Sequence, residues 1–397
     1  MLNTLDFKEL ADIDLGLTPE ELDIVQLVRE FAENELAPVA QKYEKENIYP
    51  YEQVAKFAEL GFFGLVVPTE YGGLGASHKV LALTFEELSR VWMGFAGILG
   101  SHTMMTNVLT LFGTEEQKRR WLPKLASGEL RGGTAITEPH AGSDVQAIRT
   151  VAKRTADGYR LSGTKTFLTN GKNGHVFIVV AKTDPEAQPP YKGISLFIAE
   201  KGPTFRVTRE IEKLGYKSVD TVEAVLEDHP VGFDALVGGV EGEGFRQMMT
   251  GLESGRINVA ARSVGIARAA YELALEYAQK RQAFGKPIAH HQAVQQHLAE
   301  MATKVEAARL LTLRAAAAKD LGRRVDLEAG MAKLFASEIC TQVTLDSMRI
   351  HGGYGFTKDF LIERYYRDAP LMVIGEGTSE IQRMVIARNL LKRYSVE

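Results

Sequence analysis

The sequence predicts an α+β fold that is mainly helical, with three parts in chain order. We expect an N-terminal helical domain over residues 1–133, a middle β domain over residues 134–240 and a C-terminal helical bundle over residues 241–397. Two changes of pattern predict this division. Helical periodicity gives way to β-branched and aromatic residues near residue 134, and alanine-rich amphipathic runs replace these near residue 243.

Helical spacing predicts the elements of the first part. Ile24, Leu27, Val28 and Phe31 recur at the 3.6-residue period of an amphipathic helix, with charged residues between them. Further helices are expected over residues 52–60, 79–92 and 115–125. The stretch 68–73, Pro-Thr-Glu-Tyr-Gly-Gly, has the composition of a loop.

Short strands separated by glycine-containing turns predict the β domain. The turns are expected at Asn-Gly and Asp-Gly pairs, which favour the backbone of tight hairpins. We expect strands over residues 159–161, 166–169, 175–181, 194–199 and 222–226.

Long amphipathic runs predict the helical bundle. Helices are expected over residues 247–280, 292–321 and 326–351, and a last helix begins near residue 379. Ser379 and Gln382 have the spacing of a capping box at the start of this last helix.

Composition and charge exclude several classes of protein. The net charge of −4 and the lack of a basic run argue against a nucleic-acid-binding protein. Cys340 is the one cysteine, so neither an intrachain disulfide nor a zinc cluster is expected, and its apolar helical surroundings favour a core position. No apolar run approaches the length of a membrane span. Residues 1–6 lack the pattern of a signal or transit peptide, so we expect a cytoplasmic protein; a mitochondrial matrix protein in its mature form would show the same features.

Two segments of the β domain carry groups suited to a flat polar ligand. Residues 135–144 form a turn with two hydroxyls, a glycine and exposed amides, which could hold a ring edge or a phosphate, or could be a capped surface turn. Residues 165–171 place Phe167 and Thr169 on one face of a strand. These two side chains could border a flat cofactor or could belong to an ordinary half-buried strand.

Two segments of the C-terminal part suggest a phosphate ligand. Arg281 ends a long helix, where it could bind a phosphate in a bidentate manner or could be a solvated arginine. Residues 352–355 contain three glycines, more than the end of a helix needs, and such a segment allows the close approach of a pyrophosphate. The Rossmann fingerprint and the P-loop are both missing from the sequence, so a nucleotide cofactor would have to bind in another way.

Glu376 is the candidate catalytic base. It follows four apolar residues and lies between Gly375 and Gly377, just before the last helix. Apolar neighbours raise the pKa of a carboxyl by desolvation and make the carboxylate a stronger base. The alternative is an exposed loop carboxylate that stabilises the positive N-terminus of the following helix.

Taken in order, these segments resemble the acyl-CoA dehydrogenase family over essentially the whole chain. The matching motifs are V-P-T-E-Y-G-G-L-G at 67–75, T-E-P-x-A-G-S-D at 137–144, F-x-T-N-G at 167–171, R-x-x-F-G at 281–285, G-G-Y-G at 352–355 and E-G-T-S-E-I-Q at 376–382. The resemblance implies a C-terminal four-helix bundle, bound FAD, an acyl-CoA thioester substrate, a homotetramer and an electron-transferring flavoprotein as electron acceptor. It also implies that a carboxylate removes the α-proton while the flavin accepts the β-hydride, which gives a trans-2-enoyl-CoA.

The resemblance assigns roles residue by residue. Glu376 would be the catalytic base, and its backbone N–H would help to hold the thioester oxygen. The flavin side of FAD would contact Ile136, Thr137, Gly142, Ser143, Phe167 and Thr169. The pyrophosphate and adenosine parts of FAD would contact Arg349, Gly353, Thr378 and Glu380. The residues Arg281, Phe284 and Gln292 would reach these parts of FAD from a partner chain. The acyl-CoA would contact Ser143, Glu253, Arg256 and Gly377.

Several positions depart from the family pattern. The family usually has Gln at position 349, often has Asp at position 253 and commonly has Trp at position 167. This chain has Arg349, Glu253 and Phe167, which puts the pyrophosphate, pantetheine and ring contacts in doubt. One subgroup carries its base at the position before Arg256, which is Gly255 here. Glu376 is therefore the first candidate base and Glu253 the second.

The residue before the candidate base bears on the substrate. Many straight-chain members carry a bulky aromatic side chain there, whereas this chain has Gly375. We therefore expect a short, branched or cyclic acyl group, unless a neighbouring side chain fills the space or Gly375 only gives the backbone freedom. Two rival functions stay open: an oxygen-using relative, such as an acyl-CoA or nitroalkane oxidase, and a flavin-binding relative without catalysis.

Overall fold

Helices form the first third of the described chain. The structure, a computed structural model, describes residues 16–394, so the expected features of residues 1–15 lie outside it. The first helix begins at a capping box, in which Thr18 Oγ1 accepts from the Glu21 N–H and the Glu21 carboxylate accepts from the Thr18 N–H. The helices are α2 (Pro19–Phe31), α3 (Ala37–Glu46), α4 (Tyr51–Glu59), α5 (His78–Val91), α6 (Met93–Phe112) and α7 (Glu115–Ala126).

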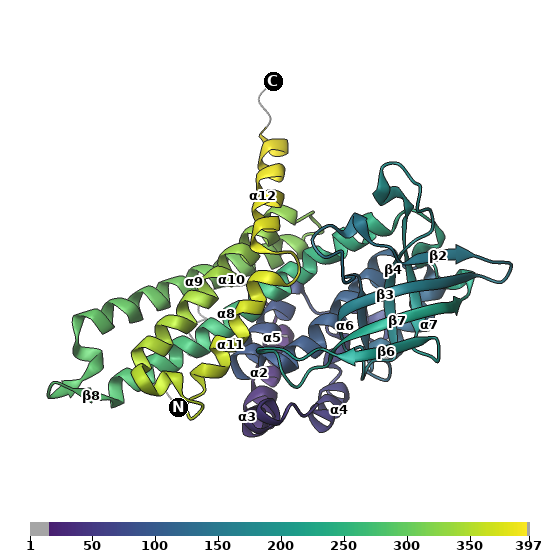
Figure 1. Cartoon of the computed structure of the whole chain (residues 1–397). Coiled ribbons are helices and arrows are strands. Elements are labelled where there is room, and N and C mark those ends of the chain that lie inside the picture. The colour runs from purple at the N-terminus through teal and green to yellow at the C-terminus, as the bar shows by residue number, and fades with distance from the viewer. Residues whose placement is uncertain (1–15, 395–397) are drawn as a thin grey trace.

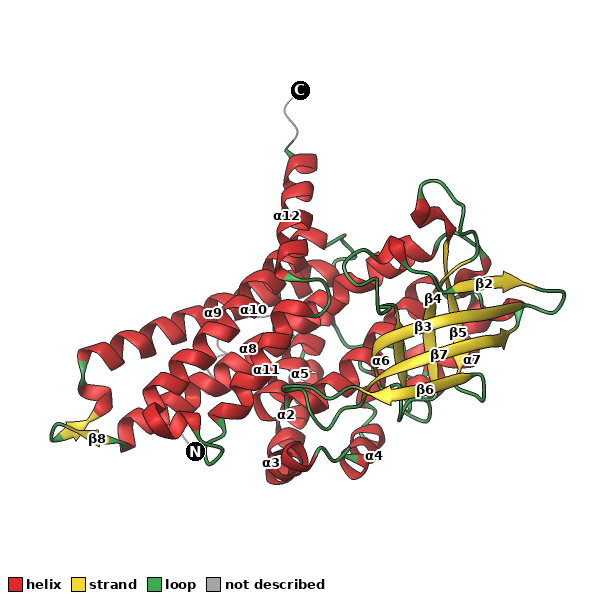
Figure 2. Ribbon diagram, in the orientation of Figure 1, coloured by secondary structure: helices red, strands yellow, loops and turns green. Residues whose placement is uncertain are grey.

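A mixed β-sheet forms the middle of the chain and lies beside the helices (Figures 1 and 2). The strand order is β1-β4-β2-β3-β7-β6, with β5 also paired to β4. One continuous strand, β3, covers the two segments expected at 159–161 and 166–169, because register shifts interrupt its pairing with β7 without ending it. The strands are β1 (Gly132–Ala135), β2 (Val151–Arg154), β3 (Tyr159–Thr169), β4 (Val176–Lys182), β5 (Ile194–Glu200), β6 (Phe205–Glu210) and β7 (Thr221–Val231).

Helices return after the sheet and form a bundle. The longest, α8, packs against α9, α10 and α11 of the bundle and also against α5 and α6 of the first part. Its buried residues therefore join the first and last parts of the chain into one hydrophobic core. The elements are α8 (Gly244–Lys280), the hairpin strands β8 (Gln282–Ala283) and β9 (Lys286–Pro287), α9 (Gln292–Asp320), α10 (Asp326–His351), α11 (Ile362–Ile374) and α12 (Ser379–Arg393).

This order of helices, sheet and helical bundle confirms the predicted α+β fold class. The limits at residues 133 and 240 stay predictions. Cys340 is buried in the core, as expected, and burial raises the pKa of its thiol. Within residues 16–394, no helix combines the length and the apolar character that crossing a membrane requires.

Candidate active site

Glu376 lies in the short turn between α11 and α12. α11 ends at Ile374, and the Gly375 N–H donates to the Leu371 carbonyl at 2.9 Å. The backbone of Glu376 then adopts the left-handed conformation with φ 55°, which is uncommon for a residue other than glycine. The turn therefore holds Glu376 in a conformation that a free loop would seldom adopt.

The helix that follows is capped one residue earlier than the sequence predicts. Its N-cap is Thr378, whose hydroxyl accepts from the Ile381 N–H at 3.4 Å. The predicted capping box of Ser379 and Gln382 is therefore wrong. Gln382 instead turns its side chain back toward the base loop, where its Nε2 donates to the carbonyls of residues 376 and 377 at 3.2 and 3.1 Å.

The carboxylate of Glu376 faces Gly255, which lies within α8. A Cβ atom on Gly255 would lie 2.7 Å from Oε2 of Glu376 and 3.2 Å from its Cδ. Real side chains do not approach so closely, so a larger residue at position 255 would displace the carboxylate. The Glu376 carboxylate thus lies against position 255 of α8. One subgroup of the family that this chain resembles is expected to carry its base at that position.

Burial and nearby cations set the charge state of Glu376. Burial raises the pKa of its carboxyl, and Arg262, Arg256 and Lys333 oppose this rise because they favour the carboxylate. Arg256 also pairs through Nη1 with Asp326 Oδ1 at 3.1 Å. Within the described chain, the Nε atoms of both arginines are buried without a hydrogen-bond partner. The carboxylate is therefore poised to accept a proton in a partly dry, cationic environment.

Tyr216 connects this carboxylate to the β domain. It lies in the loop between β6 and β7 with φ 54°, and its phenol is within hydrogen-bonding reach of the side chains of Thr169 and Arg262. The ring packs against Gly97 of α6, where a Cβ atom would lie 2.0 Å from the phenol oxygen. The predicted ring-bordering Thr169 is thus linked, through Tyr216 and Arg262, to the candidate base.

Four of the predicted flavin-side residues meet at one place in the sheet. Ile136 and Thr137 follow β1, and the Thr137 carbonyl accepts at 2.9 Å from the backbone N–H of residue 166, beside Phe167 and Thr169 in β3. Phe167 has φ 54° at a register shift of the β3–β7 pairing, and its side chain is 64% exposed. The bulge therefore turns an aromatic ring outward from the sheet. Gly142 and Ser143 lie nearby in sequence, in an exposed turn.

A buried ion pair fixes this part of the sheet. Lys165 Nζ lies 2.8 Å from Glu138 Oε1 and also donates to the Ile136 carbonyl at 3.0 Å. Glu138 in turn accepts from the backbone N–H groups of Arg149 and Thr150. The glutamate of the T-E-P motif therefore holds the loop in place, while the neighbouring residues face outward.

The predicted pyrophosphate residues lie elsewhere in the same chain. Arg281 lies at the end of α8, 5.8 Å from the ring centre of Tyr354, which brings it to Gly353 and Arg349 at the end of α10. Phe284, at the tip of the β8–β9 hairpin, is 95% exposed. Figure 1 shows this hairpin at the opposite end of the molecule from the sheet.

The remaining predicted residues fall into three places. Thr378 and Glu380 begin α12, beside Glu376, and Gln292 begins α9 after the hairpin. Glu253 is buried, and its Oε2 accepts from Lys319 Nζ at 2.8 Å. Because an α-helix turns about 100° per residue, Glu253 lies on a different side of α8 from Gly255. The second candidate base is thus held by a lysine and not placed with Glu376.

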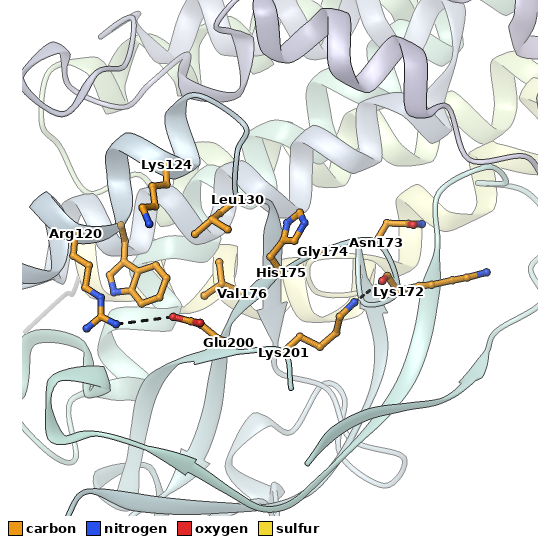
Figure 3. A pocket seen from close by; sticks show the side chains of 11 residues that line it. Arg120, Lys124, Leu130, Lys172, Asn173, Gly174, His175, Val176, Glu200 and Lys201 are labelled. Atoms are coloured by element: carbon orange, nitrogen blue, oxygen red, sulfur yellow. Dashed lines mark hydrogen bonds and ion pairs between the residues drawn. The ribbon is translucent and has the colours of Figure 1, made fainter. Parts of the chain in front are cut away.

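A cavity of about 520 Å³ lies away from Glu376, between α7 and the sheet (Figure 3). Several cations line it, including Arg120, Lys172 and Lys201. Arg120 lies 4.0 Å from Glu200, and Lys201 donates to the backbone carbonyl of Lys172. These groups already have partners, so the cavity adds nothing to the candidate active site.

Sequence reasoning missed four residues that surround the base, namely Tyr216, Arg262, Lys333 and Gln382. They come from the β6–β7 loop, α8, α10 and α12. The sequence around Lys333 contains one signal, which is a lysine on the alanine-rich apolar face of a helix. Because a lysine is rarely buried without a partner, this position indicates a buried cation with a specific partner. Gln382 stands out in the sequence only through the motif at 376–382 and the capping box that proved wrong, and Tyr216 and Arg262 carry no local pattern that marks them.

Comparison with known proteins covers all three parts of the chain. Residues 18–129 match the acyl-CoA dehydrogenase N-terminal domain, residues 133–229 the middle domain and residues 242–391 the C-terminal domain. An acyl-CoA dehydrogenase of Bacillus subtilis is 42% identical over 379 residues, which cover 95% of this chain and 99% of that protein.

Solved structures agree with this match. Butyryl-CoA dehydrogenase from Megasphaera elsdenii is 37% identical with a TM-score of 0.92, over 94% of this chain and 99% of that chain. A chain from work on the electron transferring flavoprotein of Acidaminococcus fermentans is 41% identical with a TM-score of 0.92, over 95% of this chain and 99% of that chain.

Proposed function

This chain belongs to the acyl-CoA dehydrogenase family of FAD-dependent oxidoreductases, and we propose that Glu376 is the base that takes the α-proton of its acyl-CoA substrate. The observation that carries the proposal is the Glu376 carboxylate itself. It lies against Gly255, is desolvated enough to raise its pKa, and is faced by Arg256, Arg262 and Lys333.

The residues present fit FAD. The outward ring of Phe167 beside Thr169 offers a wall for a flat ring system. At the other end, Arg281 and Arg349 lie near Gly353, and a Cβ atom on Gly353 would meet nothing within 4 Å. Arginines and an open glycine backbone suit a pyrophosphate. When bound, FAD supplies the two-electron oxidation by accepting the hydride from Cβ of the substrate.

The chain's own residues handle the proton. The Glu376 carboxylate would take the proton from Cα as the double bond forms, and its raised pKa makes it a stronger base than an ordinary glutamate. The Glu376 backbone N–H would donate to the thioester oxygen, and one such donor contributes about 3–4 kcal/mol to the stabilisation of developing charge. Arg256, Arg262 and Lys333 favour the ionised carboxylate and so oppose the effect of burial.

Glu376→Gln tests the proposal. The variant should keep FAD and bind acyl-CoA but lose nearly all turnover, measured by anaerobic bleaching of the flavin absorbance. Retention of more than about a tenth of kcat, a barrier change below about 1.4 kcal/mol, would remove Glu376 from this role. Glu253→Gln tests the second candidate base and should lose far less turnover than Glu376→Gln wherever thermal melting shows a folded protein.

We further propose a short, branched or cyclic acyl substrate. Gly375 has φ −65° and ψ 152°, which any residue can adopt, so the chain does not need glycine there for backbone freedom. A Cβ atom on Gly375 would meet only the Leu371 carbonyl oxygen, at 3.5 Å. No neighbouring side chain fills this space within the described chain, which supports room for a branch or ring beside the thioester.

Gly375→Tyr tests the substrate shape. It should lower kcat/KM for isobutyryl-CoA by about tenfold or more relative to butyryl-CoA, since one group in a pocket is worth about 1–3 kcal/mol. Equal losses on both substrates would show that position 375 does not shape the cavity. In the wild type, slow reoxidation of the reduced flavin by air would separate a dehydrogenase from the oxygen-using rival.

The assembly we propose is a homotetramer in which two chains complete each FAD site. Gly255 and Arg281 lie 26 positions apart along α8, which is about 39 Å at 1.5 Å per residue. That span exceeds an extended dinucleotide, so the two ends of one chain cannot hold the same FAD. We propose an electron-transferring flavoprotein as the electron acceptor and the cytoplasm as the location.

A further inference from the structure

Lys333 is a buried cation that the reaction described above uses only through its charge. Its side chain has no exposed surface, although lysine is among the residues least often buried. It comes from α10, whereas Glu376 lies between α11 and α12. A buried ammonium is costly unless a partner offsets the loss of water, so its partners indicate what it does.

The partner of Lys333 is the loop that carries the base. Nζ donates to the Gly377 carbonyl at 2.8 Å. The Gln382 amide reaches the same oxygen at 3.1 Å and the Glu376 carbonyl at 3.2 Å. Both carbonyls of this turn are therefore held by buried side chains from α10 and α12, next to a glutamate in a disfavoured left-handed conformation.

Resting on the proposed role of Glu376, we propose that Lys333 is a positioning residue with two separable effects: its hydrogen bond fixes the turn that aims the Glu376 carboxylate at the substrate, and its charge, held next to that turn, favours the ionised form of the carboxylate. Gln382 shares the first effect because it binds the same turn. The second effect belongs to Lys333, since an amide carries no charge.

The charged groups around Glu376 and Lys333 agree with this assignment. Glu376 is faced by Arg256 and Arg262 from α8, by Lys333 from α10 and by Tyr216 from the β6–β7 loop. Lys333 is faced in turn by Glu376, by Glu380 of α12, by Arg256 and by Glu338 of its own helix.

Lys333 is also the cation of this group that changes charge within a few pH units of neutrality. Burial lowers the pKa of Lys333 to about 8, while Glu376 opposes that change. An arginine stays protonated throughout this range. Raising the pH through 8 therefore removes the Lys333 charge but leaves its N–H donors in place.

Three variants separate the two effects. Lys333→Arg keeps the charge, Lys333→Gln keeps a donor without the charge, and Lys333→Met keeps neither. We expect Lys333→Met to lower kcat at pH 7 by about tenfold or more, as a misplaced base does, with a smaller change in KM. The rise of kcat with pH should move to higher pH by about one unit in the Met and Gln variants, because loss of a nearby cation raises the carboxyl pKa.

The behaviour at high pH distinguishes charge from position. Above about pH 9 the wild-type lysine is mostly neutral, so Lys333→Gln should approach wild-type kcat while Lys333→Met stays lower. FAD content and melting temperature, measured alongside, show whether each variant is folded and loaded. If Lys333→Met does not fold, the pH profile of Lys333→Gln decides the question.

A double variant separates failure of this inference from failure of the proposed function. If Lys333 acts through Glu376, adding Lys333→Met to Glu376→Gln should cause less than about a twofold further loss. Wild-type kcat and an unmoved pH profile in Lys333→Met and Lys333→Gln would overturn the role of Lys333 even if Glu376→Gln is inactive. An active Glu376→Gln would overturn the proposed function itself.

Discussion

Gly255→Ala should remove activity without harming stability. A Cβ atom at position 255 would lie 2.7 Å from Oε2 of Glu376, and ordinary contact begins at 3.4 Å. The carboxylate oxygen must therefore move by at least about 0.7 Å. Because a displacement of about 1 Å can cost about 100-fold in rate, we expect kcat to fall by about 10- to 100-fold.

The same substitution should leave folding intact. The atom that must move is the end of a flexible side chain, and alanine is favoured over glycine inside a helix by about 1 kcal/mol. The free energy of unfolding of Gly255→Ala should therefore equal or slightly exceed that of the wild type. Urea unfolding measures this quantity, and anaerobic reduction by acyl-CoA measures kcat.

Gly265→Ala, on the same helix, is the matched control. Its Cβ atom would lie 2.3 Å from the backbone carbonyl oxygen of Glu86 and 3.0 Å from the Arg90 backbone nitrogen, so α5 and α8 would have to separate. Such overpacking costs about 1–3 kcal/mol, and the loss should fall on stability, with kcat of the folded protein nearly unchanged. If Gly255→Ala keeps more than half of wild-type kcat, the carboxylate is not aimed as we infer.

Two further predictions concern assembly and pH. Arg281→Ala should lose FAD and weaken the tetramer together, because we assign Arg281 to a phosphate bound across a subunit boundary; an intact, fully flavinated tetramer by size-exclusion chromatography and absorbance would contradict this. Asp368, whose Oδ1 accepts from the Tyr216 N–H at 2.6 Å, has its pKa raised to about 7 by burial and by Glu44. The folded protein therefore binds a proton that the unfolded chain releases between about pH 4 and 7, so this group's contribution to stability is lost as the pH rises through that range. Asp368→Asn lacks this dependence, so its free energy of unfolding, measured in urea, should rise relative to that of the wild type from pH 5 to pH 8. Parallel pH curves for the two proteins would refute the assignment.

Periodicity predicted most of the long helices but missed α6 and α11, for different reasons. α4, α5, α7, α9 and α10 lie within one residue of the expected limits. α6 was not predicted, because it is buried on nearly all sides and so shows no alternation of apolar and polar residues. α11 was missed as well, and it contains Pro370, which normally argues against a helix interior.

Strand prediction failed where the strands are short or exposed. β1 begins with two glycines, and β6 is mostly solvent-exposed at the edge of the sheet. β2 is four residues long. β1 and β2 lack the apolar alternation that marks a strand in sequence, and in β6 it is limited to Phe205 and Val207. The place of these strands is determined by pairing with neighbours distant in the chain.

The candidate base is visible in the sequence, whereas the groups that govern it are not. Glu376 stands out because two glycines flank it in a motif of the family. Its charge state and direction depend on Gly255, Arg262 and Lys333, which lie 121, 114 and 43 positions earlier in the chain and meet it only in the fold. A relative could therefore keep the whole E-G-T-S-E-I-Q motif and still lose the reaction through one change on α8 or α10. Positions 255 and 333, rather than the motif alone, should be compared when activity is assigned from the glutamate.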